Sequence, residues 1–178
     1  SRRAAEMLGR ADDPLLRLVT CHLGNGCSMA AIRGGRSVDT SMGFTPLEGL
    51  VMGSRSGDLD PAILLHVMAK EELGAAELNA LLNKHSGLLG LSGLSNDMRK
   101  LLEAENAGNE RGNVYLDLAG DIFCYRLRKY IASYVGVLGG LDALVFTGGI
   151  GENAPVVRER SVAGLTAMGV AIDPVANA

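Results

Sequence analysis

Residues 16–33, LRLVTCHLGNGCSMAAIR, indicate how the first part of this 178-residue chain folds. Two apolar runs with strand propensity, residues 16–23 and 27–33, flank a Gly-Asn-Gly tripeptide. Glycine and asparagine adopt positive φ angles at little cost, so we expect two antiparallel strands joined by a tight tip that uses two such angles. Gly34-Gly35 predicts a second turn directly after this hairpin.

Further along the chain, the spacing of apolar residues alternates between helical and strand periods. A helix end with a turn is expected over residues 1–14, and a long structured loop over residues 37–60. One predicted helix begins after Asp60-Pro61, a second covers Leu78 to Leu82, and a third begins at a Ser95 cap. A long helix is predicted from Tyr115 to Val137, ending at Gly139-Gly140, and a last one from Pro155 to Met168. The other predicted strands are residues 142–147, which lead into a glycine turn at residues 148–153, and residues 170–173. These elements predict a mixed α/β fold.

The composition is that of an ordinary globular protein and argues against several classes. Hydrophobic residues make up 47% of the chain and charged residues 21%, which predicts a folded domain. A net charge of −3 gives no basic footprint for nucleic acid, and no apolar run approaches the roughly 20 residues that cross a bilayer. Because the start also lacks a signal-peptide core, we expect a cytoplasmic protein with no nucleic-acid or membrane partner. The three cysteines lack C-x-x-C spacing and predict neither disulfides nor a zinc site.

Glycine is enriched, with 24 residues that cluster at the edges of apolar runs, as in loops that bind phosphate. The first cluster is HLGNG, residues 22–26, with Ser28 behind it. A glycine tip leaves backbone N–H groups uncovered, so a polyphosphate can approach closely, and His22 can add a side-chain donor. A plain hairpin without a ligand is the alternative explanation.

The second cluster surrounds Arg55, which stands between small residues in the long loop. A guanidinium placed there can reach the oxygens of a phosphoryl group with its fork of donors. An exposed Arg55 paired with Asp58 is the alternative. Asp58 and Asp60 could bind magnesium, but Asp60 is explained more simply as a helix cap, so we assign no metal ligand.

A third candidate is residues 95–99, Ser-Asn-Asp-Met-Arg, at the start of a predicted helix. Asp97 and Arg99 lie within one turn and could bond ribose hydroxyls and stack on a base. Helix capping together with a surface ion pair explains the same residues and stays open as the alternative.

The fourth candidate follows the strand at residues 142–147. Gly149-x-Gly151-x-x-Ala154 satisfies a relaxed dinucleotide-binding fingerprint, and Asp173 arrives about 20 residues later, where a ribose-binding acid belongs. An NAD-dependent oxidoreductase domain is therefore an alternative. An oxidoreductase would normally place this fingerprint at the start of its nucleotide domain, whereas here it comes almost last.

Taken together and in this order, the four segments resemble the acetate kinase family. The resemblance covers nearly the whole chain and rests on HLGNG at residues 22–26, MGFTPLEGLVMGSRSGDLDP at residues 42–61, NDMR at residues 96–99 and FTGGIGEN at residues 146–153. The second motif is the most specific, because it is long and irregular. Propionate kinases share it, so a propionate or other short-chain carboxylate kinase remains an alternative.

The resemblance implies a role for each segment. The residues that would hold the ATP phosphates are His22, Leu23, Gly24, Asn25 and Gly26. The residues that would complete the nucleotide site are Asp97, Met98, Arg99, Gly149, Ile150, Gly151, Glu152 and Asn153. Arg55 would stabilise charge on the transferring phosphoryl group, and Pro46 would line a pocket for the acetate methyl group.

The resemblance also implies a context for the chain. The fold would be a ribonuclease H-like α/β core, as in actin, sugar kinases and heat-shock chaperone ATPases, with a mixed sheet and flanking helices. Residues 1–178 would be the carboxyl-terminal nucleotide-binding domain of an acetate kinase, truncated at both ends, from an enzyme that works as a homodimer. The enzyme would use ATP or ADP, Mg²⁺, and acetate or acetyl phosphate. Because the magnesium ligands and other catalytic residues would lie outside this chain, we expect it to be inactive alone.

Overall fold

The structure is a computed structural model that describes residues 1–108 and 114–178. Its contacts divide the chain into two compact units. The first unit contains residues 1–41 and 124–178, and the second contains residues 42–123. The mixed α/β class expected from the sequence is confirmed, because the first unit holds a mixed four-stranded sheet and helices occur in both units.

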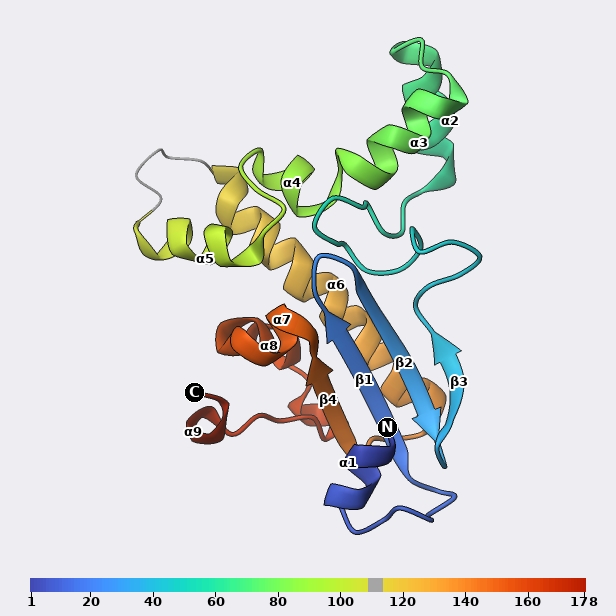
Figure 1. The fold of residues 1–178 in the computed structure, drawn as a ribbon, viewed down its shortest axis with the longest axis vertical. Coiled ribbons are helices and arrows are strands. Elements are labelled where there is room, and N and C mark those ends of the chain that lie inside the picture. Colours follow the sequence, from blue (N-terminus) through green and yellow to red (C-terminus); the bar gives the residue numbers. More distant parts are fainter. Residues whose placement is uncertain (109–113) are drawn as a thin grey trace. The chain divides into compact units, whose positions relative to one another are not determined.

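The sheet of the first unit has the strand order β3-β2-β1-β4 (Figure 1). The strands are β1 (Arg17–Leu23), β2 (Cys27–Arg33), β3 (Arg36–Thr40) and β4 (Ala143–Thr147). β2 is antiparallel to β1 and to β3, whereas β4 runs parallel to β1. Residues 37–40 were expected to begin a long loop, which is wrong. Gly34 and Gly35 have φ angles of 53° and 78°, and this tight turn returns the chain beside β2 as a third strand.

The predicted hairpin forms, but its tip differs from the expected geometry. Leu23 pairs with Cys27, which leaves a three-residue loop, and none of residues 24–26 has a positive φ angle. The Gly24 N–H donates to the Gly26 carbonyl at 3.0 Å and closes the loop. The expectation of two positive φ angles was wrong because that requirement belongs to two-residue hairpin loops.

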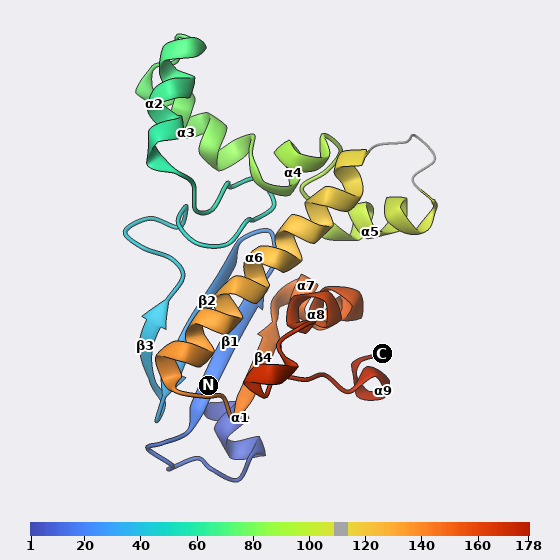
Figure 2. The ribbon, with the colours of Figure 1, turned by 180° about the vertical axis from the view of Figure 1, so that it is seen from behind.

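Helices lie on both faces of this sheet, as the two opposite views show (Figures 1 and 2). On one face α1 (Arg2–Met7) packs Ala5 against Leu18 and Ile32. The part of α6 (Val114–Leu138) that belongs to the first unit crosses the other face. The long helix ends as predicted, at Gly139 and Gly140, whose φ angles are 70° and 129°.

An ion-pair cluster fixes the amino ends of the two parallel strands. The Asp142 carboxylate accepts hydrogen bonds from the Arg17 backbone N–H at 2.7 Å and from its guanidinium at 3.1 and 3.2 Å. Arg10 contacts the same carboxylate at 3.1 Å. The hydrogen bonds from Arg17 are the main reason that the pKa of Asp142 lies well below its usual range. This cluster holds the register of β1 and β4 from the end opposite to the glycine loops.

The segment after β4 is more helical than the sequence predicts. Residues 148–153 form a helix, α7 (Gly148–Asn153), where a glycine turn was expected. The next helix, α8 (Pro155–Val162), is followed by a 3-10 turn at Thr166–Met168, so a continuous helix to Met168 was also wrong. No strand begins at residues 170–173, because Asp173 caps α9 (Pro174–Asn177).

The second unit is helical. Its helices are α2 (Pro61–Lys70), α3 (Ala75–Lys84), α4 (Gly87–Ser92), α5 (Met98–Asn106) and the first part of α6. The Asp60 cap is confirmed, since its carboxylate accepts from the Ala62 N–H at 2.9 Å. The predicted Ser95 cap is wrong: Asp97 caps α5, and the Ser95 hydroxyl instead accepts from the Asp97 N–H at 3.0 Å. Among the described residues, no helix combines the length and apolar character that a membrane span needs.

Candidate functional site

Three polar side chains form a row across the ends of neighbouring strands in the first unit. His22 pairs in register with Ser28 of β2 and with Thr147 of β4, so all three residues lie on one face of the sheet. The His22 Nδ1 atom lies 3.0 Å from the Thr147 hydroxyl. His22 is exposed, and Ser28 and Thr147 are half-buried, so the row is open to solvent. Thr147 did not stand out in the sequence, and only the parallel pairing of β1 with β4 brings it beside His22.

The hairpin tip next to this row is exposed in part. Asn25 is exposed, Gly24 and Gly26 are half-buried, and Leu23 is fully buried. The Cys27 thiol lies 3.2 Å from the Gly24 carbonyl and so helps to hold the loop. Because the Leu23 side chain is buried in the core, this residue can offer a ligand only its backbone.

Gly148 permits a close approach between the ends of β1 and β4. Its φ angle is 79°, and a Cβ atom there would lie 2.7 Å from the Leu23 carbonyl oxygen. At Gly149, by contrast, a Cβ atom would meet no atom within 4 Å. Gly148 is therefore required by the fold, whereas the space over Gly149 is open to a ligand.

The other predicted residues of this segment belong to α7 and bond mainly to one another. The Glu152 carboxylate accepts from the Gly148 N–H at 3.1 Å, and the Asn153 amide donates to the Gly149 carbonyl at 2.9 Å. Glu152 and Asn153 are exposed, Ile150 is half-buried, and Gly151 is buried against the end of β4. The exposed members of the segment are thus the ones whose side chains can reach a ligand.

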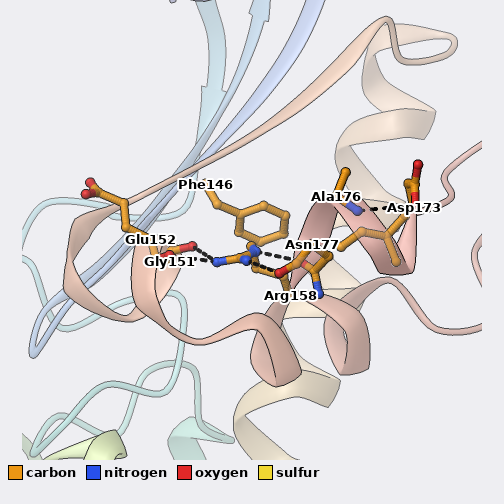
Figure 3. A pocket seen from close by; sticks show the side chains of 8 residues that line it. Phe146, Gly151, Glu152, Arg158, Asp173, Ala176 and Asn177 are labelled. Atoms are coloured by element: carbon orange, nitrogen blue, oxygen red, sulfur yellow. Dashed lines mark hydrogen bonds between the residues drawn. The ribbon is translucent and has the colours of Figure 1, made fainter.

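A cavity of about 410 Å³ lies beside α7 in the first unit (Figure 3). Its lining residues are Phe146, Gly151, Glu152, Arg158, Ile172, Asp173, Ala176 and Asn177. Arg158 crosses it and donates to the Gly151 and Glu152 carbonyls at 3.0 and 2.9 Å and to Asn177 at 2.7 Å. Because these bonds tie α9 to the end of α7, Arg158 has a structural role here.

In the second unit the structure joins two predicted residues directly. The Arg55 guanidinium donates from Nη1 to the Pro46 carbonyl at 2.8 Å and contacts the Met52 sulfur at 3.2 Å. Arg55 is half-buried, Pro46 is exposed and Met52 is fully buried. In the part of the chain that the structure describes, neither Nε nor Nη2 of Arg55 has a hydrogen-bond partner.

The loop that carries Arg55 is held by backbone hydrogen bonds. The Arg55 carbonyl accepts from the Met52 N–H at 3.1 Å, and the Met52 carbonyl accepts from the Leu88 N–H at 2.9 Å. Gly87 packs between these carbonyls with a φ angle of 62°, where a Cβ atom would lie 2.7 Å from the Arg55 oxygen. Gly87 is a residue that the sequence reasoning missed, although it lies only one position before the apolar run of α4.

Asp97 and Arg99 adopt the arrangement that the sequence left as the alternative. The Asp97 carboxylate caps α5 at 3.0 Å and accepts two bonds from the Arg99 guanidinium, at 3.1 and 2.7 Å. These bonds from Arg99 lower the pKa of Asp97 and raise the pKa of Arg99. The Arg99 side chain is 82% exposed, so one face of the guanidinium is open to a planar ligand. Met98 is buried and can contribute only its backbone.

The two aspartates of the long loop already bond to backbone N–H groups. Asp58 accepts from the Gly49 N–H at 2.7 Å, and Asp60 caps α2. Within residues 1–108 and 114–178 no cluster of three or more His, Cys, Asp or Glu side chains could hold a metal ion. We therefore assign no step of any reaction to a metal held by these residues.

The dinucleotide-binding interpretation does not fit the structure. The Asp173 carboxylate caps α9 and accepts hydrogen bonds from the Val175 and Ala176 N–H groups at 2.9 and 3.3 Å. The first strand pairs antiparallel with its successor, whereas the dinucleotide fold needs parallel strands joined by helices. Residues 22–26 and 149–153 lie in the first unit, whereas Pro46, Arg55 and residues 97–99 lie in the second. Within the second unit, Arg55 bonds to Pro46 and Arg99 bonds to Asp97.

Comparison with known proteins identifies relatives along the whole chain. Residues 1–178 match the model of the acetokinase family. The acetate kinase of Caldicellulosiruptor saccharolyticus is 57% identical over 177 residues, which are 98% of this chain and 43% of that protein. The acetate kinase of Synechococcus sp. (strain JA-2-3B'a(2-13)) is 57% identical over 178 residues, covering 100% of this chain and 43% of that protein.

Solved structures agree with these relatives. Porphyromonas gingivalis acetate kinase superposes with a TM-score of 0.92 at 45% identity, covering 98% of this chain and 43% of that one. A propionate kinase from Francisella tularensis superposes with a TM-score of 0.90 at 44% identity, covering 99% of this chain and 44% of that one. The expected ribonuclease H-like α/β core is confirmed by these superpositions. This chain spans less than half the length of the relatives that it matches.

Proposed function

The chain belongs to the acetokinase family, and from that premise we propose that it is part of an acetate kinase. The enzyme would transfer the γ-phosphoryl group of ATP to acetate and yield acetyl phosphate and ADP. In this reaction a carboxylate oxygen of acetate bonds to the γ-phosphorus as the bond to the ADP oxygen breaks. The reverse reaction forms ATP from acetyl phosphate. The 57% identical relatives, which are named acetate kinases, support this assignment.

The single structural observation that best supports the proposal is the setting of Arg55. Its Nη1 group is held by the Pro46 carbonyl, while Nε and Nη2 have no partner among the described residues. A guanidinium fixed at one corner offers its other N–H groups as a preorganised fork for phosphoryl oxygens. Since phosphoryl transfer passes through a loose, charge-spread transition state, such a fork suits its stabilisation.

The nucleotide would be held by the exposed groups of the other segments. His22 and the backbone of residues 24–26 would contact phosphate oxygens, and the open space over Gly149 would admit the nucleotide. Asp97 and Arg99 would add contacts at the adenosine, where the exposed Arg99 plane suits stacking on a base. In these roles Leu23, Met98 and Gly151 act through their backbones.

The acyl group is proposed to be acetate, with propionate as the second candidate. Pro46 would line the methyl pocket, and its hydrogen bond to Arg55 supports a pocket beside the reacting phosphoryl group. The propionate kinase superposes almost as closely as the acetate kinase, with TM-scores of 0.90 and 0.92. Comparison of the two carboxylates as acceptors in a full-length enzyme containing this segment separates the candidates.

The wider context is also a proposal. Residues 1–178 would act as the carboxyl-terminal nucleotide-binding portion of a cytoplasmic homodimer that uses ATP with Mg²⁺, whose ligands would come from elsewhere in the enzyme. The family membership supports ATP as the phosphoryl donor. Because the chain covers only 43% of its relatives' length, we propose that it binds nucleotide but does not catalyse transfer alone.

Isothermal titration of Mg-ATP into the 178-residue chain tests this proposal, with NADH as a second titrant. Gly149→Val should abolish ATP binding without unfolding the protein, because a Cβ atom there meets no other atom within 4 Å. Gly136→Val is the matched control, since Gly136 on α6 has equally open surroundings. Binding of NADH in preference to ATP, or equal binding by both variants, would contradict the nucleotide assignment. Formation of acetyl phosphate by the purified chain would contradict its proposed inactivity.

A further inference from the structure

Thr147 occupies a capping position but directs its hydroxyl away from the helix. It is the N-cap residue of α7, yet its side chain makes no cap hydrogen bond. Threonine at this position usually accepts a bond from a backbone N–H of the first turn. Here the Gly148 N–H is bonded by Glu152, and the Thr147 hydroxyl lies 3.0 Å from the Nδ1 atom of His22.

The sheet fixes the position of this hydroxyl. His22 and Thr147 are paired in the register of the parallel strands, with both side chains on one face. Directly after Thr147, Gly148 lies so close to the Leu23 carbonyl that any side chain would clash. The hydroxyl and the imidazole are therefore brought together by the backbone of two strands, and neither has to be ordered when a ligand arrives.

The contact has a chemical consequence for the exposed imidazole. A neutral histidine carries one proton, so its two nitrogens divide the roles of donor and acceptor. If Nδ1 accepts a bond from the Thr147 hydroxyl, the proton lies on Nε2. Phosphate oxygens are hydrogen-bond acceptors, so only this tautomer of a neutral His22 can donate from Nε2 to a phosphate.

We infer that Thr147 is a positioning residue that donates to His22 Nδ1 and so presents Nε2–H to a phosphate oxygen of the nucleotide. The inference rests on the proposed function for the identity of the ligand. The contact between Thr147 and His22 does not depend on it, and the two parts can be tested separately.

Nitrogen-15 NMR of the imidazole rings of the 178-residue chain provides the test. Spectra are recorded at about pH 9, where an imidazole is neutral, for the wild type, Thr147→Val and Thr147→Ser. Valine keeps the shape of threonine without the hydroxyl, and serine restores the hydroxyl. His22→Gln assigns the signal, and His66 and His85, both in the other unit, are internal references. Thermal melts check that each variant is folded.

The wild type should show Nδ1 as a hydrogen-bonded acceptor with the proton on Nε2. In Thr147→Val the Nδ1 shift should move to that of an unbonded acceptor, and in Thr147→Ser it should not. A proton on Nδ1 in the wild type, an unchanged shift in Thr147→Val, or a serine variant that behaves like valine would overturn the contact.

Titration of Mg-ATP into the same proteins tests the consequence for binding. Loss of one positioned hydrogen bond should weaken ATP binding about three- to tenfold in Thr147→Val, with serine restoring the affinity. If the Nδ1 shift moves but the ATP affinity does not, Thr147 is not a positioning residue for the ligand. If the wild type does not bind ATP, the proposed function fails, while the NMR result still decides the contact.

Discussion

A hydrogen bond of 2.8 Å joins the Arg55 guanidinium to the carbonyl oxygen of Pro46, nine residues earlier in the chain. The two residues have different proposed tasks, since Arg55 would stabilise the transferring phosphoryl group and Pro46 would contact the acyl group. Their direct contact couples these tasks. A change in the loop backbone at Pro46 would displace the guanidinium, and loss of the guanidinium would release the loop.

Arg55→Lys should separate charge from geometry at this position. Lysine keeps the positive charge but lacks the planar fork, so its single nitrogen would have to serve both the Pro46 carbonyl and the phosphoryl oxygens, without the fixed geometry of a guanidinium. In a full-length enzyme containing this segment, kcat should fall about a thousandfold or more. Because the residue is only half-buried, the free energy of unfolding should change by less than about 1.5 kcal/mol. Retention of near-normal kcat would contradict the role given to Arg55.

Met52→Leu tests whether the thioether helps to hold the guanidinium. Sulfur is a weak acceptor, and leucine replaces methionine in a core at a cost below about 1.5 kcal/mol. We expect kcat of the full-length enzyme to fall about three- to tenfold through a less ordered Arg55, with KM little changed. Met29→Leu is the matched control, because Met29 is equally buried but lies on β2 in the other unit. An equal effect of both substitutions would attribute the loss to core packing.

The sequence predicts well those elements that local signals specify. The hairpin at residues 16–33, the Asp60 cap and the end of α6 at Gly139-Gly140 each rest on residues adjacent in the chain, and the structure confirms them. The third strand was missed because its burial pattern is exposed throughout, so residues 36–40 show no apolar alternation. Its place is set by pairing with β2, which the strand's own residues do not encode.

The same distinction applies to the candidate site. The motifs identify Arg55, His22 and the glycine segments, but the residues that support them come from distant parts of the chain. Thr147 reaches His22 only through the parallel pairing of β1 with β4, 125 residues apart. Gly87 supports the Arg55 loop through backbone contacts that no local sequence pattern predicts. Sequence reasoning therefore finds the groups proposed to contact a ligand more readily than the groups that hold them.

Gly148→Ala and Gly149→Ala should differ sharply in stability although they are neighbours. A Cβ atom at Gly148 would approach the Leu23 carbonyl to 2.7 Å at a positive φ angle, whereas at Gly149 it would meet nothing within 4 Å. We expect Gly148→Ala to lower the free energy of unfolding by about 1–3 kcal/mol. Gly149→Ala should change it by less than about 1 kcal/mol. Urea denaturation of both variants measures this difference, and equal midpoints would contradict the close approach of the two strand ends.

The Asp142 carboxylate should make stability depend on pH in acid. Its pKa is lowered chiefly by the Arg17 side chain, so the folded state binds the Asp142 proton more weakly than the unfolded state. The stabilising effect is therefore complete above the unfolded pKa of about 4 and is lost as the pH falls toward the lower folded pKa. At neutral pH, Asp142→Asn should lower the free energy of unfolding by about 1–3 kcal/mol, because Arg17 and Arg10 lose a charged partner.

The pH dependence of the stability difference between wild type and Asp142→Asn shows whether the charge of Asp142 or only the packing of its side chain stabilises the fold. Urea midpoints of wild type and Asp142→Asn should differ most between about pH 5 and 7 and converge below about pH 4, as the wild-type carboxylate becomes protonated. Asp121→Asn is a suitable control, because Asp121 is an exposed residue in the interior of α6 that makes no ion pair with another described residue. Its urea midpoint should follow the wild type at every pH. A constant difference between wild type and Asp142→Asn from pH 7 to pH 3 would mean that the shape of the side chain, and not its charge, holds the amino ends of β1 and β4 together.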